Sequence, residues 1–461
     1  GLFAAMHTTE GPVQSALNTI CPPSDGQLWL VNITGQNRDG EIVELRSDAD
    51  MSGMAIRTAS GEGVLQSIVR ANGDKRCVAP VADVPALGWS AAQLGLAAHT
   101  PKSGLSVSKT HLENDLITVR FDENSDISSI IDKTSARELI QSGKRANWLV
   151  AYEDKPKNYD AWDIDQYFEE KSWPLSDASV TIEVVETGPH RAALRIERQY
   201  ARSRIVQVIS LQDGQMQIEF DTEIDWQERQ TLLKTGFPFD LNVSETRAEI
   251  QFGHVKRPSH KNTSWDQARF ETSMHRWVDM SEPDFGAALL TDCKYGYDAV
   301  EQTVRLTLLK GSNVPDPDAD LGLHHFRYAL LLHQGEKDVS EVVRAAETFN
   351  TPVLVHGALE NTVMDRLPLD PGVYFAVMDN PDLTLETVKL AENGNDVIMR
   401  IFEHSNRRSA GRLQFAMTVS QVTETDLMER TSGKSYEIAD NGVDLSFRPF
   451  EIKTLRVTID R

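Results

Sequence analysis

Two carboxylates and two aromatic rings stand close together at Tyr159, Asp160, Trp162 and Asp163. Hydrolysis of a glycosidic bond needs a pair of carboxyl groups, one ionised and one kept as an acid. Aromatic rings also suit sugars, because a ring stacks on C–H faces while acids accept hydrogen bonds from hydroxyls. These residues are therefore candidates for contact with a sugar. Composition alone favours the alternative of a surface loop anchored by a buried Trp162, since acidic residues are mostly exposed.

Histidines offer a second place for chemistry. His324 and His325 follow the aspartate-rich segment 316–320 and precede His333. Zinc needs three or four converging His, Asp or Cys ligands, and no HExxH or similarly compact spacing occurs. A structural histidine pair in a strand is the favoured interpretation, and we predict no metal site in this chain. A calcium loop is also disfavoured, because Arg327 stands where the bidentate glutamate is required.

Other catalytic patterns are missing from the sequence. It contains no GxSxG nucleophile elbow, no phosphate-binding Walker loop and no GxGxxG. From the residues alone we therefore assign no catalytic residue and no cofactor to this chain.

Composition limits the classes of partner. The 461 residues carry a net charge of −22, and the basic residues form no concentrated stripe, so we exclude nucleic acid. Cys21, Cys77 and Cys293 are an odd set without CxxC spacing, which indicates a reducing compartment. No apolar run is long enough to cross a membrane, and the amino terminus lacks the pattern of a signal peptide. We expect a cytoplasmic protein without a membrane partner.

Strand patterns dominate the elements that must position these residues. Residues 1–25 end in a turn and linker signal, and the strands that follow predict a small β-domain over 26–106. Regularly spaced strands over 107–358 predict a large antiparallel sandwich, with Asp213–Gly214 as a hairpin turn. One helix is predicted near 338–349, because apolar residues recur there at helical spacing. Further strands predict a terminal β-sandwich over 359–461. The fold class is thus mainly β, with few helices.

Several segments in one order carry a family resemblance. The stretch from His260 to Glu271, HKNTSWDQARFE, resembles the C-terminal β-region of family 38 glycoside hydrolases, the zinc-dependent α-mannosidases. Residues 223–238, with DWQER, LLK and FP, are similar to another family segment. Residues 154–163 resemble the aspartate and tryptophan loop of its bacterial and cytosolic-type branch, and residues 315–324, PDPDADLGLH, resemble a further one.

The resemblance implies an architecture and an activity. The large β-domain would be a supersandwich of the galactose mutarotase-like type, and residues 1–25 would be the end of a helical bundle and its linker. The parent enzyme would hydrolyse terminal α-mannosides with retention. Its zinc ligands, nucleophile and acid would lie in N-terminal domains that this chain lacks, so this chain alone is expected to be inactive. Its partners would be those catalytic and helical domains, an α-mannoside oligosaccharide and a possible second copy.

The resemblance also adds substrate-binding candidates, namely Lys310, Asp320 and His324. The family often has arginine where this sequence has Lys310, and lysine lacks the planar fork of arginine. Two other functions remain open: a stand-alone carbohydrate-binding or assembly module, and a mutarotase-like epimerase. The epimerase would need a self-contained histidine and carboxylate site, which we do not find in the sequence.

Overall fold

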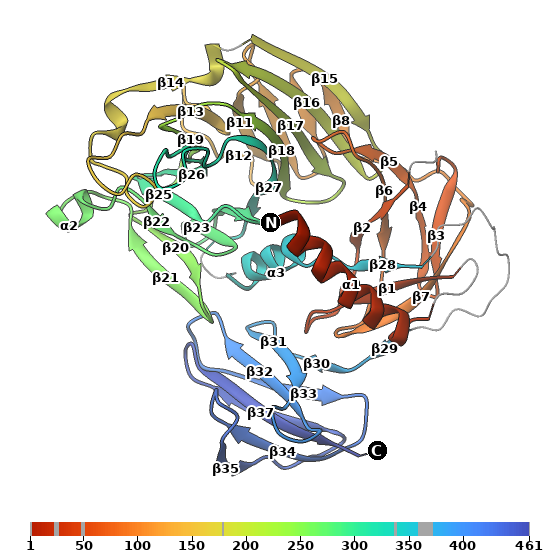
Figure 1. Cartoon of the computed structure of the whole chain (residues 1–461). Coiled ribbons are helices and arrows are strands. Elements are labelled where there is room, and N and C mark those ends of the chain that lie inside the picture. The colour runs from red at the N-terminus through yellow and green to blue at the C-terminus, as the bar shows by residue number, and fades with distance from the viewer. Residues whose placement is uncertain are drawn as a thin grey trace. The chain divides into compact units, whose positions relative to one another are not determined.

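The chain is built mainly of antiparallel strands (Figure 1). The computed structural model describes residues 2–22, 27–47, 51–177, 179–335, 339–357 and 372–460. Within these ranges three α-helices occur: α1 (Leu2–Ile20), α2 (Ser264–Gln267) and α3 (Val339–Asn350). None of these helices is long and apolar enough to span a membrane. The prediction of a mainly β fold with few helices is confirmed.

The chain divides into two compact units. Unit 1 comprises residues 1–67, 75–101 and 351–461, and unit 2 comprises residues 68–74 and 102–350. The candidate sugar-contact residues all belong to unit 2.

A nine-stranded antiparallel sheet forms one layer of unit 2. Its order is β15 (Ser179–Thr187), β16 (Arg191–Tyr200), β17 (Ser203–Gln212), β18 (Gln217–Trp226), β27 (Gly322–His333), β24 (Gly286–Thr291), β23 (Trp277–Ser281), β20 (Glu245–Ile250) and β21 (Gly253–Pro258). From Tyr328 to His333, strand β27 is buried on both faces, whereas its first residues are more exposed. Its even-numbered residues, such as Tyr328 and Leu330, enter the main core of unit 2, while Ala329 and Leu331 pack with α3. This division follows from the two-residue period of a strand.

Two further sheets of unit 2 contribute to the same core. The six-stranded sheet has the order β14 (Ser172–Pro174), β13 (Trp148–Glu153), β19 (Thr231–Pro238), β26 (Thr303–Leu309), β25 (Gly296–Val300) and β22 (Thr272–Ser273). The five-stranded sheet has the order β12 (Arg137–Glu138), β11 (Ile127–Asp132), β10 (Ile117–Phe121), β9 (His111–Glu113) and β8 (Ser106–Ser108). Aromatic rings fill the centre, where Phe220 stacks on Tyr328 at 4.9 Å between ring centroids. The large antiparallel sandwich predicted from the sequence is therefore present.

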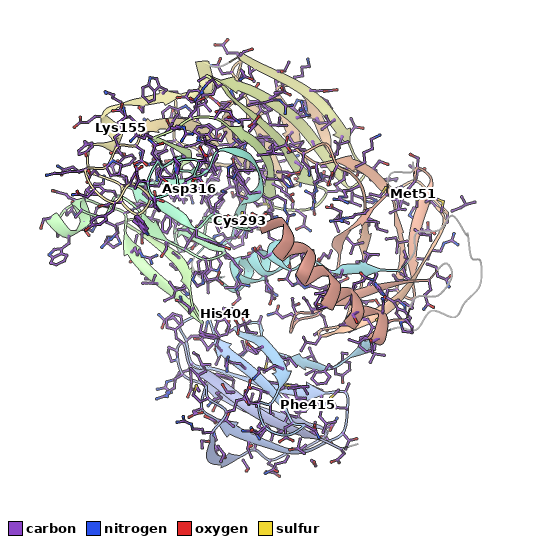
Figure 2. The ribbon with its side chains drawn as sticks, viewed as in Figure 1. Met51, Lys155, Cys293, Asp316, His404 and Phe415 are labelled. Atoms are coloured by element: carbon purple, nitrogen blue, oxygen red, sulfur yellow. The ribbon has the colours of Figure 1, made fainter. Side chains whose placement is uncertain are left out.

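The described residues of unit 1 form four sheets, and strand β5 of the second sheet continues into unit 2. The first has the order β28 (Leu354–His356), β1 (Gln27–Asn32), β7 (Gly88–Leu96), β3 (Met54–Thr58) and β4 (Gly61–Val64), with β29 (Val373–Tyr374) also paired to β7. The second is β2 (Glu41–Arg46), β6 (Lys75–Val81) and β5 (Gln66–Val69). The terminal sandwich consists of β30 (Ala376–Met378), β33 (Ser409–Phe415) and β36 (Gly442–Phe447), and of β31 (Leu383–Leu390), β32 (Val397–Glu403), β37 (Ile452–Ile459), β34 (Val419–Thr425) and β35 (Thr431–Ser435). Phe415, labelled in Figure 2, lies in the core of this sandwich.

Two segments lie in a different unit of the structure from the one that the predicted domain boundaries imply. Strand β28 lies in the range predicted for the large β-domain, yet Leu354 pairs with Val31 of β1. Residues 68–74 lie in the range predicted for the small β-domain, yet Ala71 packs with Val206 and Val208 of unit 2. Both differences arise from non-local pairing, which strand patterns along the chain do not specify. The linker residue Ser24 and the predicted boundary at 359 lie outside the described residues.

Candidate functional site

The residues predicted to contact a sugar lie on loops at one edge of the six-stranded sheet, except His324, which lies within strand β27 of the nine-stranded sheet. Residues 159–163 follow β13, Lys310 follows β26, and Asp320 precedes the start of β27. Since β13 and β26 each pair antiparallel with β19, they run parallel and end at the same edge. Lys155 and Asp316, labelled in Figure 2, mark two of these loops.

Lys310 connects the loops through its ammonium group. Its Nζ donates to Asp154 Oδ2 at 2.5 Å and to the carbonyl oxygen of Asp163 at 2.7 Å. Asp154 is 1% exposed, and its Oδ1 has no hydrogen-bond partner among the described residues. Burial raises the pKa of the Asp154 carboxyl, although the ion pair with Lys310 opposes the increase. Lys310 therefore compensates a buried carboxylate and fixes the loop after β13.

Two of the predicted aspartates hold backbone groups in place. Asp160 Oδ2 accepts from the amides of Asn313 and Val314 at 2.6 and 3.1 Å. Asp320 Oδ2 accepts from the amide of Lys310 at 2.9 Å. The Asp320 carbonyl accepts from His324 Nε2 at 2.8 Å, which places the ring proton on that nitrogen. The carboxylates of Asp160 and Asp320 therefore set the shape of the loops.

The aromatic residues of the cluster project into solvent. The exposed fraction is 72% for Tyr159 and 74% for Trp162. Both belong to a tight turn, in which the Tyr159 carbonyl accepts from the amides of Trp162 and Asp163 at 2.8 and 2.9 Å. The alternative of a buried tryptophan anchor is wrong, because the Trp162 side chain is largely exposed. Two exposed rings and the exposed side chain of Asp163 are the groups that a ligand could meet.

A buried ion network behind this edge was not predicted as functional from the sequence. Lys234, 1% exposed, donates through Nζ to Glu271 at 2.5 Å, to Asp298 at 2.9 Å and to Thr307 at 2.7 Å. Burial alone lowers the pKa of Lys234, but the carboxylates of Asp298 and Glu271 outweigh it and raise that pKa. A lysine inside the apolar run of β19 was the available signal, because a buried lysine needs compensating charge.

The histidines do not converge on one point. His325 pairs with Asp221 at 2.7 Å, whereas His333 is buried and pairs with Asp279 at 2.9 Å. Ser281 lies 3.5 Å from the same Nε2 of His333, so one ring nitrogen faces both partners and no proton relay is formed. Within the described ranges, no group of three or more His, Cys, Asp or Glu side chains is arranged to hold a metal ion.

Comparison with known proteins gives the context of this site. Residues 112–318 match the glycosyl hydrolases family 38 C-terminal domain, and residues 382–455 match the C-terminal β-sandwich domain of the same family. The chain is 35% identical over 353 residues to alpha-mannosidase 2C1 of Mus musculus, covering 76% of this chain and 33% of the relative. It is 31% identical over 362 residues to alpha-mannosidase G of Dictyostelium discoideum, covering 75% and 32%.

A solved structure shows the same fold over nearly all of the chain. An alpha-mannosidase from Enterococcus faecalis V583 superposes with a TM-score of 0.73 at 15% identity, covering 96% of this chain and 58% of that protein. The chain thus spans about a third of the length of the curated relatives that it matches. Together these matches show that the chain carries the C-terminal β-region of glycoside hydrolase family 38.

Proposed function

We propose that this chain is part of an α-mannosidase that hydrolyses terminal α-mannosides with retention. The supporting observation is that family 38 domains match residues 112–318 in unit 2 and residues 382–455 in unit 1, in a chain similar to curated alpha-mannosidases. In this proposal the zinc and the carboxylate nucleophile reside in N-terminal catalytic and helical domains outside this chain. This chain's own residues supply scaffold and one wall of the sugar pocket, and none of them performs the chemical step.

The wall of the pocket is proposed to be the cluster of Tyr159, Trp162 and Asp163. Trp162 would stack on the C–H face of a mannose ring, and the Asp163 carboxylate would accept from sugar hydroxyls. Lys310, Asp160 and Asp320 act as positioning residues, since their polar groups are already engaged with the loops. Preorganised loops of this kind reduce the ordering that binding otherwise requires.

The test is a substitution in the whole protein that contains this chain. Trp162→Ala is expected to lower kcat/KM for an aryl α-mannoside by roughly 10- to 1000-fold, about 1.4–4 kcal/mol of transition-state stabilisation. Trp265→Ala is the matched control, because Trp265 is 84% exposed on α2 and lies outside the proposed wall. Wild-type kinetics in a correctly folded Trp162→Ala protein would show that the loop is structural.

The isolated chain is expected to hydrolyse no α-mannoside and to bind no stoichiometric zinc. The reason is that the proposed nucleophile and zinc ligands lie in other domains. The measurement is an assay of the purified chain with an aryl α-mannoside and zinc, together with metal analysis. Turnover that persists through purification and requires residues of this chain would contradict the proposal.

We also propose a cytoplasmic location. Cys21, Cys77 and Cys293 are all free thiols in the structure. Free thiols in a chain of this size are typical of a reducing compartment. Fractionation of the native cell with compartment markers tests this location, and recovery of the protein with secreted markers would contradict it.

A further inference from the structure

Three asparagines of the chain, Asn72, Asn393 and Asn441, are each followed by glycine, and the structure holds them differently. An asparagine can lose its side-chain amide when the backbone nitrogen of the next residue attacks the side-chain carbonyl carbon. Glycine favours this attack, because it has no Cβ to hinder the approach. Reaction therefore depends on whether the asparagine side chain and the glycine amide are free to move together.

Asn441 is held on both sides of the reacting pair. Its Nδ2 donates to the carbonyl oxygens of Phe415 and Met417 at 2.9 and 2.6 Å. The amide of Gly442, which would have to attack, donates to the Ala439 carbonyl at 3.0 Å. Reaction at Asn441 would have to break these hydrogen bonds first.

Asn72 is held by fewer contacts. Its Oδ1 accepts from the amide of Asp74 at 3.0 Å. The amide of Gly73 donates to the Arg70 carbonyl at 2.9 Å, so the nitrogen that would attack is part of a turn. Reaction at Asn72 is therefore also restrained.

Asn393 lacks both kinds of restraint. Asn393 and Gly394 are exposed in the loop that joins strands β31 and β32 (Figure 1). Within the described part of the chain, neither the Asn393 side chain nor the Gly394 amide makes a hydrogen bond. The space around Gly394 is open, since a Cβ built on it would meet no atom within 4 Å. The nitrogen of Gly394 and the side chain of Asn393 can therefore approach each other.

We propose that Asn393 is a site of spontaneous deamidation, which converts it to aspartate and isoaspartate. The Gly394 nitrogen gives up its proton and forms a bond to Cγ of Asn393. The bond between Cγ and Nδ2 breaks, and Nδ2 takes up a proton and leaves as ammonia. The product is a cyclic succinimide.

Water then opens the succinimide ring in either of two ways. Cleavage of the new bond between Cγ and the Gly394 nitrogen gives aspartate at position 393. Cleavage of the original peptide bond gives isoaspartate, in which the chain continues through Cγ and the former backbone carbonyl becomes a free carboxylate.

The modification changes the charge at a contact of this loop. Arg456 donates through Nη1 to the Asn393 carbonyl at 3.5 Å and lies 3.6 Å from Asp396. In isoaspartate the group that accepts from Arg456 becomes a carboxylate, and the backbone of the loop is lengthened. Deamidation therefore gives Arg456 a charged partner in place of a neutral one.

The test is to incubate the folded chain at mildly alkaline pH, digest it under acidic conditions and follow each asparagine peptide by mass spectrometry. Asn393 is expected to deamidate about 10-fold or more faster than Asn441, because reaction at Asn441 must first break hydrogen bonds. Aspartate and isoaspartate should both form at position 393. Asn395 is the matched control, since it is exposed in the same loop but is followed by Asp396.

Two further measurements separate the effect of the fold from that of the sequence. Asn393→Gln should abolish the reaction at this position, because ring closure of the longer side chain is much slower, and should leave Asn72 and Asn441 unchanged. In concentrated urea the three asparagines should react at similar rates, since the restraints of the folded chain are then absent. In the folded chain, equal rates at Asn393 and Asn441, or aspartate without isoaspartate at position 393, would overturn the proposal.

Discussion

Lys310 and Asp154 form the ion pair on which the shape of the candidate sugar-contact loops depends. The lysine side chain is 18% exposed and the aspartate 1%. Removing one member of a buried pair leaves an uncompensated charge, which destabilises more than the pair itself stabilises. The effect of a substitution at Lys310 is therefore set by the desolvated carboxylate of Asp154.

We predict that Lys310→Met lowers the free energy of unfolding by about 3 kcal/mol, as measured by urea denaturation at pH 7. Adding Asp154→Leu should recover most of this loss, because no buried charge then remains. Lys155→Met is the control, since the Lys155 side chain is 53% exposed and pairs with the half-buried Glu153 on the surface. A loss in Lys310→Met no larger than in this control would disprove the structural role.

His325 gives unit 2 a pH dependence. Its Nε2 lies 2.7 Å from the buried Asp221 carboxylate, and this hydrogen bond raises the pKa of His325, with burial opposing the shift. A group whose pKa is raised on folding stabilises the folded state, and the whole of this stabilisation is present below the pKa of the group in the unfolded chain, which is about 6.5 for histidine. The stabilisation is lost as the pH rises through the higher folded pKa.

We predict that the melting temperature of unit 2 decreases as the pH rises from 6.5 through the higher folded pKa of His325. The substitution His325→Gln should make the melting temperature less dependent on pH over this range. Scanning calorimetry across pH 5.5–9 measures it. His99→Gln serves as the control, because the His99 side chain is 62% exposed in unit 1. An identical pH profile in wild type and His325→Gln would refute the linkage to Asp221.

At the residue scale, the sequence indicated candidate residues for sugar contact but not the hydrogen bonds that each side chain makes. Asp160 was a candidate for sugar contact on residue type and Asp320 through the family resemblance, and in the structure both carboxylates accept from backbone amides. Which hydrogen-bond donors surround a carboxylate depends on the conformation of the loops, and spacing along the sequence does not predict that conformation. Lys234 was overlooked for the related reason that its partners, Glu271 and Asp298, lie far along the chain.

At the scale of elements, the buried face of helix α3 could be predicted from the sequence. The apolar residues whose helical spacing predicted this helix, among them Val342, Ala346 and Phe349, are buried with Trp277 and with residues of strands β24 and β27. Phe349 also lies under Arg327, whose guanidinium carbon is 4.8 Å from the ring centroid. Helical periodicity is local, so the sequence was sufficient to predict this face. The predicted start at Asp338 lies outside the described residues.

We predict that Phe349→Ala lowers the free energy of unfolding of unit 2 by roughly 3–5 kcal/mol, the usual range for removal of a buried phenylalanine. Arg344→Ala, on the exposed side of α3, should change it by less than about 0.5 kcal/mol. Denaturant unfolding followed by the fluorescence of Trp277 and its neighbours measures both. Equal effects of the two substitutions would mean that α3 does not pack as described.

The pairing of strands was harder to predict from the sequence than the buried face of helix α3. Alternating patterns indicated many strands correctly as β, as in the Asp213–Gly214 hairpin between β17 and β18. They did not indicate that β28 returns to β1, or that Ala71 packs on β17. These contacts join residues that are far apart along the chain, and a two-residue period carries no information about the partner.

At the scale of the whole molecule, the exposed aromatic residues are unevenly distributed. All the exposed tryptophan and tyrosine side chains among the described residues belong to unit 2: Trp148, Tyr159, Trp162, Tyr167, Trp173, Trp265 and Tyr295. Exposed tryptophan and tyrosine are characteristic of surfaces that bind other molecules. In unit 1 the large exposed hydrophobic side chains are aliphatic, for example Leu390 and Met428.

The isolated chain is therefore expected to self-associate through unit 2, because these rings remain in water when no partner domain covers them. Sedimentation equilibrium at micromolar concentrations should show reversible association, and Tyr159→Ser with Trp162→Ser should weaken the association constant by about 10-fold, or about 1.4 kcal/mol. Leu390→Ser is the control, because Leu390 is a hydrophobic side chain of unit 1 that is 69% exposed. If the chain stays monomeric at all concentrations, or if Leu390→Ser has the same effect, the rings of unit 2 do not form a docking surface. Their exposure would then be explained by sugar contact alone, which the Trp162→Ala kinetics measure independently.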